Sequence, residues 1–73
     1  MIKINNEEYN LINFKHHDVE NVQHLHVIIH GSLKCDDLKV SISHKNKHYF
    51  GQKVLTTSRD GFSEILVYLY PEV

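Results

Sequence analysis

The sequence predicts a single, mainly β domain, folded as a small antiparallel roll, barrel or sandwich of about six strands. The chain has 73 residues, which is enough for one domain (1–73) with a small core and leaves no room for a second domain. It contains no alanine and no tryptophan, and its apolar side chains are mostly Val, Ile, Leu, Phe and Tyr, which favour strands over helices. The stretch LKVSISH (residues 38–44) alternates between apolar and polar positions, as a strand with one buried face does.

Turn residues separate the expected elements along the chain. Asn5 and Asn6 tolerate the positive φ of a tight turn, so the first two apolar segments are expected to form a hairpin. Asp60 and Gly61 supply the turn of a later hairpin, and Gly51 marks a bulge or a close backbone approach within a strand. The expected strands are residues 1–4, 9–15, 24–30, 38–44, 48–57 and 62–70, and the expected connections include residues 16–23 and 32–37.

The segment around residues 18–30 also fits a helix, and this is the main alternative to the all-strand reading. Asp18 is a suitable N-cap and Gly31 follows the last residue, as at many helix ends. The β-branched run at Val27–Ile29 argues against the helix, because such residues lose side-chain freedom there.

Three histidines interleave with aliphatic residues in HLHVIIH (residues 24–30). On a strand, His24, His26 and His30 share one face, and we interpret that face as the solvated side of an amphipathic strand. No metal is expected, and His24 and His26 are the candidates if one is bound, because residues two apart are separated by about 6.6 Å. His30 is about 13 Å from His26 and cannot join them.

A zinc site would then need two more ligands from elsewhere in the chain. Those available are His16, His17, Cys35, Asp36 and Asp37, none of which stands at a typical zinc-motif spacing. Whether the seven histidines instead sense pH stays open, since histidine is the side chain whose unperturbed charge change lies closest to physiological pH.

The last strand is apolar on both faces. A strand in a single sheet with one solvent-exposed face would instead alternate apolar and polar residues. Ile65, Val67 and Leu69 fall on one face, and the opposite face carries Leu66, Tyr68 and Tyr70. Either another part of the chain covers this second face or it binds a partner. The expected partner-binding residues are Leu66, Tyr68 and Tyr70, joined by Tyr49 and Phe50 from the preceding strand.

Charge and motif content exclude several classes of function. The formal net charge is −1, without a basic stripe, so nucleic acid and anionic membrane are not expected partners. A single cysteine cannot form an internal disulfide, and no long apolar run is present, so we expect a cytoplasmic protein that needs no cofactor. The three glycines stand alone and no serine has a nucleophile-elbow context, so we do not expect an enzyme.

Seven lysines against one arginine, with frequent Asn and Ile, are typical of AT-rich coding sequence and suggest a phage or other mobile-element origin. The stretches IKINNEEYNLINF and YFGQKV are similar in pattern to the first β-barrel elements of phage tail hub and spike-type proteins. From the doubly apolar last strand and a mobile-element origin, we expect a non-catalytic protein-binding module that inhibits a host protein or complex by occluding it. The alternatives are a small structural subunit of a phage particle, which would form a homo-oligomer, and a His-rich metal-binding domain.

Overall fold

The computed structural model describes residues 1–71 and shows seven antiparallel strands in one sheet, which confirms the prediction of a small, mainly β fold. The strands are β1 (Ile2–Ile4), β2 (Glu7–Tyr9), β3 (Leu11–Val19), β4 (Val22–His30), β5 (Lys39–His44), β6 (Lys47–Arg59) and β7 (Phe62–Leu69). Their order in the sheet is β2-β1-β5-β6-β7-β4-β3. Residues 1–71 contain no helix, and so none that could cross a membrane.

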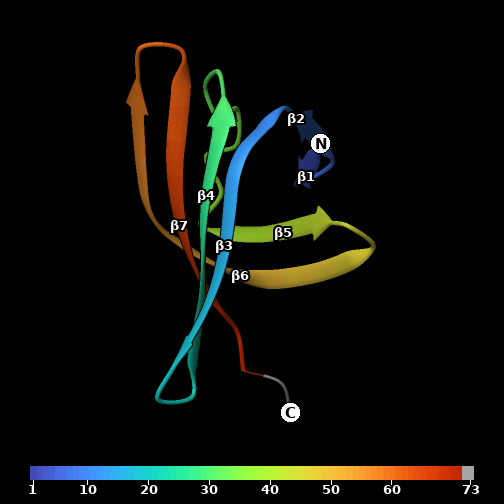
Figure 1. Cartoon of the computed structure of the whole chain (residues 1–73), viewed down its shortest axis with the longest axis vertical. Helices are drawn as coiled ribbons and strands as arrows, with labels where there is room; N and C mark the ends of the chain where they lie inside the picture. Colours follow the sequence, from blue (N-terminus) through green and yellow to red (C-terminus); the bar gives the residue numbers. More distant parts are fainter. Residues whose placement is uncertain (72–73) are drawn as a thin grey trace.

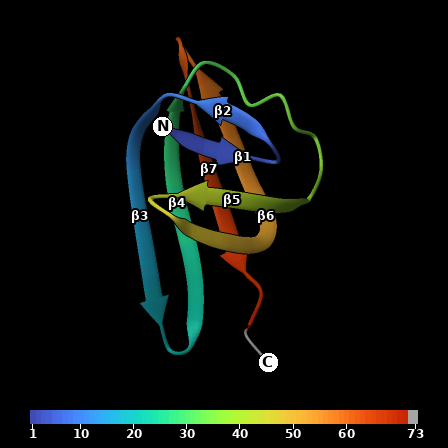
Figure 2. The same cartoon turned by 90° about the vertical axis from the view of Figure 1, so that its right-hand side faces the viewer.

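The sheet is strongly curved, and the long strand β6 pairs with a different neighbour along each of its halves. The first half of this 13-residue strand pairs with β5 and the second half pairs with β7. A register shift between Lys53 and Leu55 lies within the stretch paired with β7, and irregularities of this kind bend a strand and increase its twist. As a result β1, β2 and β5 lie across one face of β4 and β7 (Figures 1 and 2).

The core fills the space between the two crossed parts of the sheet. Alternate residues of β4 and β7 point into it, as the period of two in a strand requires. Residues of β1, β2 and β5 meet them from the other side. The buried apolar residues are Ile2, Ile4, Tyr9, Leu25, Val27, Ile29, Val40, Ile42, Ile65 and Val67.

The hairpin turns are made where the sequence offers residues that accept positive φ. Asn5 and Asn6 join β1 to β2, and Asn46 follows Lys45 in the turn from β5 to β6, all with φ between 48° and 70°. Gly61, with φ of 84°, closes the turn between β6 and β7. Ser32 to Asp37 form no regular element, as the composition predicts.

The structure overturns two expectations for residues 16–30. The polar stretch 16–23 is not a connection and residues 18–30 do not form a helix, since β3 and β4 run through them as one hairpin. Glu20 and Asn21 supply the two-residue turn, with φ of 50° and 67°. The tip of this hairpin extends beyond the core, so its strand residues stay exposed and need no apolar alternation. The expected strand 9–15 is also divided, because Asn10 separates β2 from β3, which raises the strand count to seven.

Gly51 holds β6 against β7, as its position within a strand predicts. A Cβ atom built there would contact the carbonyl oxygen of Tyr68 and lie 2.8 Å from Val67 Cγ1. Only glycine allows the two backbones to approach this closely, so Gly51 fixes where the exposed side chains of the two strands lie relative to one another.

Candidate functional site

The sheet has an outer face, which we define as the surface of β3, β4, β7 and β6 opposite the core. On β7 this face carries Leu66 and Tyr68, while the intervening Ile65 and Val67 are buried in the core. No element within residues 1–71 lies across it (Figures 1 and 2). The second apolar side of β7 is therefore solvent-accessible surface.

Four of the five expected partner-binding residues come together on the outer face. Tyr68 lies opposite Gln52 in the pairing of β7 with β6. The backbone amide of Tyr70 donates to the carbonyl of Phe50 at 2.9 Å, so the hydrogen bonding between the two segments continues past the end of β7. Leu66 is next in line and pairs with Leu55 across the register shift. The exposed fractions are 59% for Phe50, 58% for Leu55, 47% for Tyr68 and 43% for Tyr70.

Tyr49 has a different environment from the other four. It follows the opposite alternation on β6 and is half-buried, with its ring centroid 5.7 Å from those of both Phe14 and His16. Tyr49 therefore packs β6 against β3. It also lines a broad opening of about 940 Å³ where β7 ends, together with Phe50 and Tyr70.

Histidines continue the outer face on the side of β3 and β4. His17 lies opposite His24 in the register, and their rings stack with centroids 4.7 Å apart. The ring of His24 is in turn 5.8 Å from that of Tyr68, which joins the histidines to the tyrosines of β7. His26 Nε2 lies 2.9 Å from Glu64 Oε2 on β7.

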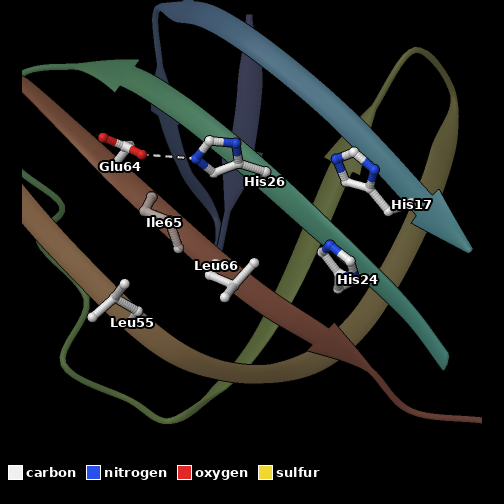
Figure 3. A pocket seen from close by; sticks show the side chains of 7 residues that line it. All are labelled: His17, His24, His26, Leu55, Glu64, Ile65 and Leu66. Atoms are coloured by element: carbon white, nitrogen blue, oxygen red, sulfur yellow. Dashed lines mark hydrogen bonds and ion pairs between the residues drawn. The ribbon is translucent and has the colours of Figure 1, made fainter. Parts of the chain in front are cut away.

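These side chains surround a shallow hollow of about 270 Å³ (Figure 3). His17 enters it from β3, His24 and His26 from β4, Glu64 and Leu66 from β7, and Leu55 from β6. His26 and Glu64 are about one third exposed, at 34% and 38% of their side-chain surface. Within residues 1–71 no three His, Cys, Asp or Glu side chains already point at a common metal position.

The remaining candidate ligands lie away from this hollow. His30 is at the far end of β4 and is exposed, and His16 is on the inner side of β3, where its Nε2 is 3.0 Å from Gln23 Oε1. Cys35 is half-buried in the loop before β5, and its sulfur accepts a hydrogen bond from Asn5 Nδ2 at 2.9 Å. Asp37 Oδ2 is 3.9 Å from the same sulfur, so these loop residues form a separate group.

His44 is part of the inner packing. Its ring lies 4.3 Å from that of Phe14, and its Nδ1 is buried without a hydrogen-bond partner in the described part of the chain. Burial first, then the positive charges of Lys45 and the N-terminal amino group, lower the pKa of His44 from its usual 6.5.

Sequence reasoning missed two members of the outer face. His17 was only one of several remote ligand candidates, because its position opposite His24 depends on the two-residue turn at Glu20 and Asn21. Leu55 was missed because the register shift after Lys53 changes which residues of β6 face outward. The polar pair Glu20-Asn21 between Val19 and Val22 was the signal that could have located the hairpin.

Comparisons with protein-family models, with curated proteins and with solved structures found no match for this chain.

Proposed function

We propose that this protein is a small non-catalytic protein-binding module that uses the outer face of β6 and β7 as its contact surface. The observation that carries the proposal is the ladder of large apolar side chains left exposed on two adjacent strands. Its exposed members are Phe50, Leu55, Tyr68 and Tyr70, and Leu66 beside them is half-buried.

The chemistry of this face suits a protein partner. Interface cores are rich in aromatic side chains, and tyrosine combines a large apolar ring with a polar tip. Gly51 keeps β6 and β7 tightly paired beside these residues, so the face is presented by a rigid element. A rigid aromatic surface loses little conformational freedom on binding.

The composition adds a narrower form of the proposal. A phage or mobile-element protein of this size would act in the host cytoplasm as an inhibitor, by covering a functional surface of a host protein or complex. The outer face offers the apolar centre that such a contact needs, and the exposed polar residues around it offer a rim.

Site-specific photo-cross-linking in the cells that make the protein tests the proposal. A benzophenone side chain is placed at Tyr68 in one variant and at Ile12 on β3 in a control, because both residues are 47% exposed. We expect a defined adduct with one other protein from Tyr68, and none from Ile12. Equal adducts from both positions, or no adduct from Tyr68, would contradict the proposal.

The same experiment separates the structural-subunit alternative. If a second copy of the chain occupies the outer face, the adduct from Tyr68 has twice the mass of the chain. Light scattering on the purified protein would then show a homo-oligomer that dissociates when Tyr68 and Phe50 are replaced by serine.

A further inference from the structure

Three histidines from two strands meet on one side of the sheet. In the register His17 lies directly opposite His24, and His26 is two residues further along β4 on the same face. All three line the hollow in which Glu64 also lies (Figure 3). The sequence alone offered the pair His24 and His26, and the hairpin adds a third imidazole next to it.

The spacing of these histidines suits one metal ion. The side chains of a cross-strand pair such as His17 and His24 start about 4.5–5.5 Å apart, and a diagonal pair such as His17 and His26 about 7–8 Å apart. His24 and His26 are separated by about 6.6 Å along the strand. Imidazole nitrogens bind zinc at about 2.0–2.1 Å, and rings that start at these separations are close enough to approach one ion.

The imidazole rings of His17 and His24 must rotate before the three histidines can share one ion. The rings of His17 and His24 are stacked at 4.7 Å, and within residues 1–71 no three ligands already share a centre. Both lie on the solvent side of the sheet, where side-chain torsions change without disturbing the core. Rotation about these torsions can exchange the stacked arrangement for one that directs the nitrogens into the hollow.

Glu64 is placed to support a bound ion. With the proton on His26 Nε2, that nitrogen donates to Glu64 Oε2 at 2.9 Å and leaves the Nδ1 lone pair free. A carboxylate in this position fixes the ring and makes the imidazole a stronger ligand, as it does behind many metal-bound histidines.

We propose that His17, His24 and His26 bind one Zn²⁺ ion on the outer face, with Glu64 orienting His26. Neutral imidazole is a preferred ligand of zinc, and three protein nitrogens leave the fourth tetrahedral position to water. The site adjoins the proposed protein contact, because Leu55 and Leu66 line the same hollow, but no step in its geometry requires a partner. The other histidines do not contribute: His30 is about 13 Å from His26 along β4, and His16 points to the inner side.

The test is a titration of untagged, metal-free protein with Zn²⁺ alone at about pH 7.5, where the unperturbed imidazole is mostly neutral. Calorimetry gives the stoichiometry, and NMR of the histidine rings identifies the ligands. We expect one ion per chain and ring shifts at His17, His24 and His26. Affinity should fall at about pH 5.5, because protonated imidazole cannot bind metal.

Variants separate this site from unspecific binding by a histidine-rich chain. His17→Ala should weaken binding by at least about 100-fold, and Glu64→Gln by about 10–100-fold. The matched controls His16→Ala, on the same strand with the opposite orientation, and His30→Ala should leave the affinity unchanged. Circular dichroism confirms that each variant is folded. Absence of saturable binding, or equal losses in His17→Ala and His16→Ala, would overturn the proposal.

Discussion

A methyl group at Gly51 is expected to force β6 and β7 apart. A Cβ atom there would lie 2.8 Å from Val67 Cγ1 and 3.0 Å from Leu69 Cα, and it would also contact the carbonyl oxygen of Tyr68. Carbon atoms pack best at about 3.5–4.0 Å, so the backbone of β7 must move by about 0.5–1 Å. Two of the three contacts are with backbone atoms, which cannot rotate away as a side chain can.

The magnitude follows from two opposing effects. Overpacking of this kind costs about 1–3 kcal/mol, and the backbone contacts place Gly51→Ala near the upper end. Alanine also restricts the unfolded chain, which returns about 0.4–1 kcal/mol. We expect the free energy of unfolding to fall by about 2 kcal/mol, and the midpoint of thermal unfolding to fall by about 8–16 °C.

Urea unfolding followed by circular dichroism measures this difference. The control is Gln52→Ala, because Gln52 is the exposed neighbour of Gly51 on the same strand and its replacement should change stability by less than about 0.5 kcal/mol. A loss below about 0.5 kcal/mol for Gly51→Ala would show that β6 and β7 are not in close contact here. The pairing of Phe50 with Tyr70 would then be wrong as well.

Two further predictions concern the inner side of the sheet. The pKa of His44 is lowered from 6.5 in the folded chain. As the pH falls below about 6.5, the unfolded chain therefore binds a proton at this residue before the folded chain does, and the free energy of unfolding decreases. Urea unfolding at about pH 7.5 and about pH 5.5 should therefore show a smaller loss of stability on acidification for His44→Gln than for the unaltered chain, and an equal loss would contradict the assignment. Ser63 is fully buried and its hydroxyl donates to the carbonyl of Gly31 at 2.7 Å, so Ser63→Ala should lower the free energy of unfolding by about 1–3 kcal/mol. Ser58→Ala, at the exposed neighbouring hydroxyl, is the control and should cost less; the reverse order would show that the bond to Gly31 contributes little.

Much of the sheet could be predicted from local patterns. The alternation of β5 placed Val40 and Ile42 in the core, and the Asn5-Asn6 pair and Gly61 marked turns. Each of these signals depends only on neighbouring residues, because a period of two or a positive φ is a local property. The apolar character of β7 on both faces likewise pointed to surface that needs a covering or a partner.

Features set by long-range pairing could not be predicted in this way. The tip of the β3–β4 hairpin has no core to face, so its polar sequence resembled a connection. The shift between Lys53 and Leu55 adds a residue to β6 without any turn residue to mark it, and it decides that Leu55 faces outward. The meeting of His26 with Glu64 follows from the order of β4 and β7 in the sheet, which the sequence did not specify.

If the outer face of β7 is open to a partner, its tyrosines must be accessible to solvent in the free protein. NMR with a soluble paramagnetic probe compares Tyr68 and Tyr70 with Tyr9, which is buried at 6% exposure. We expect strong broadening of the Tyr68 and Tyr70 ring signals and little change at Tyr9. Protection of Tyr68 and Tyr70 equal to that of Tyr9 would contradict it, because the face would then be covered in the free protein.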